Sequence, residues 1–187
     1  MVSQKFLTTF DLNSAASIST PRSILRLLSP GDFEGILDLF NEPDTFRFIP
    51  HLQHKSTDEY LAVLANRLNQ IASGLALHWT ARTPEGELIG VLNYSPIQDS
   101  GRMQLGFQIR SKFHRQGLAK ELAGAVVQYL RAQQNGLIYG VCSVDHIASA
   151  TVLERTGFKL NEMREDVSIY VLDLGDEPSS SNKGKSS

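Results

Sequence analysis

The segment that decides the fold runs from Ile109 to Lys120 and has the sequence IRSKFHRQGLAK. It joins a predicted strand over 103–109 directly to a predicted helix over 116–134. The small residues Gly117 and Ala119 let a ligand approach the backbone where the helix begins. The first N–H groups of a helix have no partner within the helix, and with the helix dipole they bind anions. The segment therefore predicts an anion site at a strand–helix junction.

The charge of this segment supports the same interpretation. It carries four basic residues, Arg110, Lys112, Arg115 and Lys120, and no acidic residue. The remainder of the chain carries 14 basic against 20 acidic residues. A local positive charge suits a polyphosphate ligand. A helix start with solvated basic side chains has the same pattern, and spacing alone does not choose between the two.

The other predicted elements follow from capping and turn signals. Ser29 with Pro30 begins one helix, and the Ser56–Glu59 capping box begins a second that ends at Gly74. The predicted strands are 23–28, 77–83, 88–95, 103–109, 137–144, 158–163 and 167–174, with a short helix over 149–156. Short turns predict an antiparallel patch, and the strand–helix–strand unit over 103–144 predicts a parallel pair with a right-handed crossover. The fold class is therefore α/β: a mixed, mostly antiparallel sheet of six to seven strands with helices on both faces.

Composition limits the domain organisation and the partners. The chain has 187 residues, a net charge of −2 and one cysteine. We expect an N-terminal extension over 1–20, one domain over 21–175, and a disordered Ser-rich tail over 176–187. The charge gives no sign of nucleic acid or a membrane as partner, and a single thiol excludes a disulfide framework. We expect a cytoplasmic protein. We also expect no metal site, because His51 and His54 have no carboxylate nearby to complete one.

The junction resembles the coenzyme loop of the GNAT N-acetyltransferase superfamily, whose pattern is Gln/Arg-x-x-Gly-x-Gly/Ala. Gly117 and Ala119 match this pattern, whereas His114 stands where Gln or Arg is expected. A second segment, 148–158, is similar to a signature of the ribosomal-protein N-terminal acetyltransferase-like branch, although His146 replaces its Asn. The matching residues there are Ser149, Leu153, Glu154, Gly157 and Phe158. The resemblance covers about 22–174.

This resemblance implies a GNAT fold in which a splayed parallel strand pair holds the pantetheine arm of acetyl-CoA. It implies direct transfer of the acetyl group to a primary amine, either of a protein N-terminus or of a small molecule. The protein would be a monomer or a homodimer, and no metal would take part. The residues predicted to bind the coenzyme are Gln108, Ile109, Arg110, His114, Arg115, Gln116, Gly117, Leu118, Ala119, Lys120, His146 and Ser149. Backbone groups of Gln108 and Ile109 would pair with the pantetheine amides.

The predicted catalytic residues are His146 and Ser149, and each has a second interpretation. His146 titrates in the range useful for a base, but a packing role in place of the missing Asn is favoured. Ser149 would contact the coenzyme, or it would cap the short helix. Leu153 stands where many relatives carry a Tyr that protonates the leaving thiolate, and Gln104 where relatives often carry Glu. For Cys142, a buried structural thiol is the favoured interpretation.

Three functions remain open at this stage. The first is an active acetyl-CoA-dependent N-acetyltransferase. The second is a catalytically weak or inactive acyl-CoA-binding domain with a regulatory or interaction role, which the missing Glu and Tyr favour. The third is an interaction domain without a coenzyme, against which the basic cluster argues.

Overall fold

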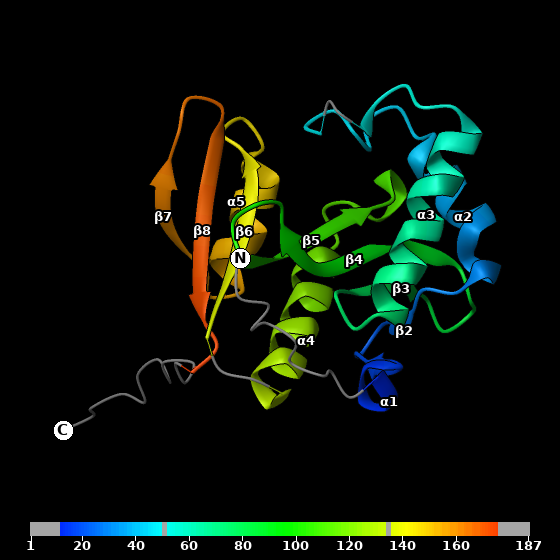
Figure 1. The fold of residues 1–187 in the computed structure, drawn as a ribbon, viewed down its shortest axis with the longest axis horizontal. Helices are drawn as coiled ribbons and strands as arrows, with labels where there is room; N and C mark the ends of the chain where they lie inside the picture. The colour runs from blue at the N-terminus through cyan, green and yellow to red at the C-terminus, as the bar shows by residue number, and fades with distance from the viewer. Residues whose placement is uncertain (1–11, 50–51, 134–135, 176–187) are drawn as a thin grey trace.

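The computed structural model describes residues 12–49, 52–133 and 136–175, so the predicted tail and His51 lie outside the described residues. These residues form one sheet flanked by helices (Figure 1). The strands are β1 (Ser17–Ser19), β2 (Ile24–Leu27), β3 (Leu77–Arg82), β4 (Leu88–Ile97), β5 (Arg102–Ile109), β6 (Leu137–Ser143), β7 (Lys159–Met163) and β8 (Val167–Asp173). The helices are α1 (Leu12–Ala15), α2 (Phe33–Phe40), α3 (Thr57–Ala72), α4 (Leu118–Gln133) and α5 (Ile147–Arg155). None of the described helices is long and apolar enough to cross a membrane.

The sheet has the predicted mixed, mostly antiparallel character. Its strand order is β1-β2-β3-β4-β5-β6-β8-β7, and β5 with β6 is the parallel pair. The described residues form eight strands, whereas six to seven were predicted. The additional strand is β1, whose Ser-Ile-Ser sequence is too short to show an alternating pattern and is ordered by pairing with β2.

Two hydrophobic cores lie on opposite faces of the sheet. The larger core packs α4 and α5 on one face and includes Leu122. The second core packs α2 and α3 on the other face and includes Leu64. Neighbouring residues of β4 alternate between them, because Leu92 belongs to the first core and Val91 to the second. In Figure 1, α2 and α3 lie side by side over β3 and β4.

The N-terminal segment packs on the domain as far as it is described. Ala15 is fully buried, and its carbonyl oxygen accepts a hydrogen bond of 2.9 Å from the indole Nε1 of Trp79. Trp79 is itself 1% exposed, as expected for a core residue. The described part of the predicted extension thus docks on this chain's own sheet.

The helix boundaries confirm some capping predictions and correct others. Ser56 and Glu59 form the predicted capping box at the start of α3. Pro30–Asp32 after Ser29 form a 3-10 turn, and α2 begins only at Phe33. The predicted start of the short helix at Ser149 is wrong, because α5 begins at Ile147. The amide of Ala150 donates to the carbonyl of His146 at 3.1 Å, which is the first hydrogen bond of the helix. The helix therefore begins directly after His146.

Candidate functional site

The parallel strands β5 and β6 separate along their length. They pair only at Met103 with Ile138 and at Gln104 with Tyr139, near the start of each strand. From there β5 continues to Ile109 and β6 to Ser143 without pairing to each other. The predicted splayed pair is therefore confirmed, and the backbone edge of β5 beyond Gln104 is open on the side of β6.

The pairing of β4 with β5 shows which backbone groups face this gap. The amide of Arg110 donates to the carbonyl of Ile89 at 2.8 Å, toward β4. Backbone groups along an antiparallel strand alternate in direction, so those of Gln108 also face β4, whereas those of Ile109 and Phe107 face the gap. The structure thus differs from the prediction that backbone groups of both Gln108 and Ile109 are available to a ligand in the gap.

The junction after β5 has the backbone shape of an anion site. A 3-10 turn over Ser111–Phe113 follows β5, and α4 begins at Leu118, two residues later than predicted. Arg115 and Gly117 have φ angles of 60° and 76°. This left-handed region suits glycine and is uncommon for arginine. The first free N–H groups of α4 therefore belong to residues just after Gly117, where no Cβ obstructs a ligand.

One side of the junction is held by Glu42, which follows α2. Its Oε1 accepts from Arg110 Nε at 2.7 Å, and its Oε2 accepts from the amide and the hydroxyl of Ser111, both at 2.8 Å. Desolvation raises the pKa of Glu42, but the hydrogen bonds from Ser111 and Arg110 outweigh it and leave the pKa below its ordinary value. This contact ties the end of α2 to the start of the junction.

The positive charge of the junction is smaller in space than in sequence. Arg110 is neutralised by Glu42, and Lys112 forms an ion pair with Glu87. Among the described residues, Arg115 and Lys120 make no ion pair. Two of the four predicted positive charges therefore remain for a ligand, and both lie beside the start of α4.

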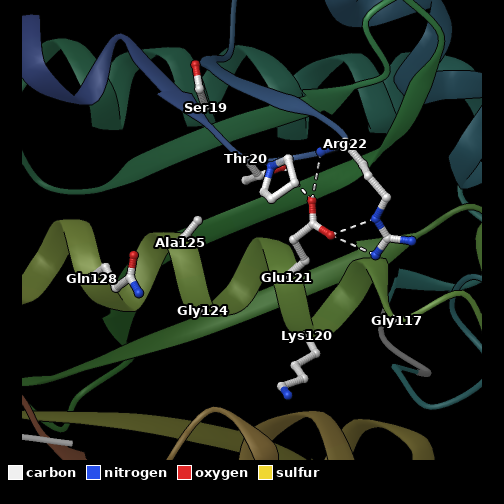
Figure 2. A pocket seen from close by; sticks show the side chains of 10 residues that line it. Ser19, Thr20, Arg22, Gly117, Lys120, Glu121, Gly124, Ala125 and Gln128 are labelled. Carbon is white, nitrogen blue, oxygen red and sulfur yellow. Dashed lines mark hydrogen bonds and ion pairs between the residues drawn. The ribbon is translucent and has the colours of Figure 1, made fainter.

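A second contact holds the outer side of α4. A pocket with a volume of about 460 Å³ lies along this side of α4. Arg22 pairs with Glu121 there at 2.7 Å, and Figure 2 shows the side chains that line the pocket. Arg22 also donates to the carbonyl of Gln116 at 2.9 Å, and Thr20 donates to Glu121 at 2.7 Å. Lys120 points away from the Arg22–Glu121 pair (Figure 2). The first turn of α4 is thus fixed from the N-terminal segment, and the Lys120 side chain is left out of that contact.

Two aromatic rings stack beyond the end of β6, and a third ring, that of His114, is bonded to the end of β5. Nε2 of His114 donates to the carbonyl of Ile109 at 2.8 Å, one of the groups that face the gap. Phe48, from the connection between α2 and α3, stacks on His146 with ring centroids 4.1 Å apart and planes inclined by 16°. Burial, and then the charge of His114, lower the pKa of His146, so its imidazole is neutral at pH 7. Sequence reasoning did not identify Phe48 as part of the site.

Ser149 does not cap α5, so that interpretation is wrong. It lies in the first turn of the helix, is 9% exposed, and the residue at the cap position is His146. Burial raises the pKa of the Cys142 thiol, and hydrogen bonding with Ser149 counteracts this in part. The Ser149 hydroxyl therefore faces β6, which borders the gap. Cys142 belongs to the larger core, and Leu153 is 1% exposed in the same core.

Beyond Arg102, the face of β5 toward α2 and α3 is polar and uncharged. It carries Gln104, Gly106 and Gln108, which are partly exposed, whereas the opposite face packs into the larger core. Asn93 of β4 donates from Nδ2 to Ser95 Oγ at 2.8 Å. A Cβ on Gly106 would lie 2.6 Å from Asn93 Oδ1, so the Asn93 amide occupies the space above this glycine. The sequences of β3, β4, β5 and β6 contain no acidic residue.

No group of three or more His, Cys, Asp or Glu side chains is placed to hold a metal ion within the described part of the chain. The pair His51 and His54 is not tested by this finding, because His51 lies outside the described residues.

Comparison with known proteins identifies the family. Residues 22–159 match the family model described as an acetyltransferase (GNAT) domain. The chain belongs to the GNAT acetyltransferase family. A relative in Bacillus subtilis (strain 168), described as the uncharacterized N-acetyltransferase YoaA, is 26% identical over 145 residues, which are 76% of this chain and 82% of that protein.

Solved GNAT structures share the fold. The ribosomal L7/L12 α-N-protein acetyltransferase RimL, in complex with coenzyme A, has a TM-score of 0.72 and 18% identity over 84% of this chain and 97% of that one. The spermidine N-acetyltransferase from Vibrio cholerae, in complex with CoA and spermine, has a TM-score of 0.67 and 20% identity over 81% of this chain and 95% of that one. At these identities the comparison shows a common fold and leaves the acceptor of this chain open.

Proposed function

We propose that this protein transfers the acetyl group of acetyl-CoA to a primary amine. The observation that carries the proposal is the open edge of β5 next to the start of α4. The pyrophosphate would bind the backbone amides of residues 115–120, with Arg115 and Lys120 supplying charge. The pantetheine amides would pair with the backbone of Phe107 and Ile109, which already faces the gap, as an added strand would.

The chemistry is direct transfer. The neutral amine attacks the thioester carbon, a C–N bond forms, the C–S bond breaks, and the coenzyme leaves as a thiolate. The N–H of Phe107 faces the gap farther from the junction than Ile109 does, and it is available to stabilise the oxyanion that develops on the carbonyl. Holding the two reactants in position supplies much of the remaining acceleration, since good geometry is worth ~7–11 kcal/mol.

Side chains contribute little to proton transfer in this proposal. His146 is neutral at pH 7 and lies near the gap, but its ring is stacked on Phe48. Leu153 cannot protonate the thiolate, and Gln104 cannot take a proton from the amine. Deprotonation would therefore go through water, with His146 as a modest contributor.

A second candidate function is coenzyme binding without efficient catalysis. Gln104 and Leu153 favour it, because they replace the base and the acid that relatives often carry. Acetyl-CoA binding followed by turnover with a panel of primary amines separates the two. Binding without transfer to any amine favours the second function. No rise in melting temperature with acetyl-CoA would contradict both.

The coenzyme site is tested by Gly117→Trp. An indole there would occupy the space that the phosphates need, and we expect the dissociation constant for acetyl-CoA to rise at least a hundredfold. Gly74→Trp is the matched control, because Gly74 has a similar φ of 68° and lies at the end of α3 with nothing within 4 Å of an added Cβ. Equal coenzyme binding by Gly117→Trp and the parent would place the site elsewhere.

A further inference from the structure

A polar pair beneath α3 has no role in the chemistry described so far. Arg67 of α3 is partly buried, with its Cζ 5.5 Å from the ring centroid of Phe40. Burial lowers the pKa of Arg67 to about 10, so it is still charged at pH 7. No ion pair or hydrogen bond joins it to another described residue. Buried charges in proteins are usually paired, so within the described part of the chain Arg67 is a cation without a counter-charge.

His78 of β3 lies next to this cation and is also incompletely bonded. It is 6% exposed, and its Nε2 donates to Oε1 of Gln70 at 2.8 Å. Its buried Nδ1 has no hydrogen-bond partner. Burial, and then the charge of Arg67, lower the pKa of His78 to about 3, so its ring is neutral. A buried polar atom without a partner requires an explanation, and a hydrogen donor from a ligand would provide one.

The pairing of the strands relates this pair to the gap. His78 lies opposite Asn93 on β4, and Asn93 lies opposite Gly106 on β5. Neighbouring strands are ~4.8 Å apart, which places His78 about 10 Å from β5. The opposite face of β5 is filled by the larger core, so an amine reaches the gap from the face that carries His78. The N–H of Phe107, next to Gly106, is therefore about 10 Å from His78, a distance that a small molecule spans. His78 in turn bonds to Gln70, one turn of α3 beyond Arg67.

We propose that the acceptor amine carries a carboxylate that Arg67 binds while the amine reaches the thioester beside β5. This inference rests on the proposed acetyl transfer. A guanidinium binds a carboxylate through two parallel hydrogen bonds. A hydroxyl or amide N–H of the same acceptor would donate to Nδ1 of His78. A polyamine finds no acidic partner on β3 to β6 and is repelled by Arg67.

The first experiment compares matched acceptors. Unbranched ω-amino acids of two to six carbons, and dipeptides with Asp or Glu in second position, are each paired with the corresponding amide, with spermidine alongside. The parent is expected to favour at least one acid over its amide by tenfold or more in kcat/KM, mainly through KM. Arg67→Met should reduce that preference to within twofold. Arg155→Met, which removes an exposed charge on α5, should retain it.

The second experiment needs no turnover. The N-acetylated product of each acid and of its amide is titrated into the protein, with the ¹⁵N signals of the His78 ring as readout. The acid product should bind at least tenfold more tightly than its amide and shift these signals, and Arg67→Met should abolish both effects. Equal binding of acid and amide throughout, or an unchanged preference in Arg67→Met, would overturn the proposal. Arg67-dependent binding without any acetyl transfer would instead leave this site standing and refute the proposed activity.

Discussion

Glu42→Gln tests how the junction is held in place. The substitution keeps the size of the side chain and removes the charge that Arg110 and Ser111 contact at 2.7 and 2.8 Å. Hydrogen bonds to charged groups are worth ~1.5–3 kcal/mol each. Some of this energy is lost to screening, because the side chains of Arg110 and Glu42 are 23% and 17% exposed. We therefore expect a loss of about 2 kcal/mol in the free energy of unfolding, or about 4–8 °C in Tm for a chain of this size.

The stabilisation that the Glu42 carboxylate provides must decrease as the pH falls. The folded-state pKa of Glu42 lies below its ordinary value of 4.5. Its stabilisation is therefore complete above that value and is lost as the pH falls through the folded-state pKa. The difference between the parent and Glu42→Gln should be full at pH 7 and should shrink as the pH falls below about 4.5.

Urea denaturation at pH 7 and in steps below pH 4.5 measures this difference, and an acetyl-CoA titration at pH 7 shows whether the junction still binds coenzyme. Glu34→Gln is the control, since Glu34 is an exposed acid on α2 without an ion pair among the described residues. Equal stability of the two variants at pH 7, or a difference that does not change on acidification, would refute the electrostatic argument.

The remaining predictions concern the gap itself. His146→Ala should cost about tenfold or less in turnover, with a pH–rate profile that rises toward the pKa of the acceptor amine; a thousandfold loss at unchanged coenzyme affinity would make His146 the base. Gly90→Ala should lower the free energy of unfolding, measured in urea, by ~1–3 kcal/mol, because its Cβ would lie 2.2 Å from the Gln108 carbonyl oxygen. Gly124→Ala is the control and should not lower it, since a Cβ there has nothing within 4 Å. Ser149→Ala should mainly weaken acetyl-CoA binding in calorimetry; a lower Tm alone would assign Ser149 a structural role.

The elements that the sequence predicted correctly are those with local signals. The capping box at Ser56 and the parallel pair around α4 each follow from residues close together in the chain. The strand β1 has no such signal, because it is ordered by pairing with β2 and by the burial of Ala15 beneath Trp79. The start of α5 was placed too late because Ser is a frequent cap, although here the turn at His146 already begins the helix.

The junction shows why the number of basic residues in a segment does not give the positive charge that the folded segment presents. Arg110 and Lys112 belong to a run without acids, yet Glu42 and Glu87 meet them from other parts of the chain. Folding thus removes half of the charge that suggested a polyphosphate ligand. The argument for the site then depends on backbone geometry, namely the left-handed Gly117 and the open edge of β5. The number of charged residues contains no information on either feature.

The connection between α2 and α3 links the two sides of the gap. At its start Glu42 holds the junction after β5, and further along Phe48 stacks on His146 after β6. Both contacts join segments that are far apart in sequence, and neither depends on a local signal. Because one short segment contacts the ends of both splayed strands, its position constrains how far they separate. We therefore expect acceptor and coenzyme binding to be coupled through Phe48 and Glu42, so that substitutions at either residue alter the affinity for both.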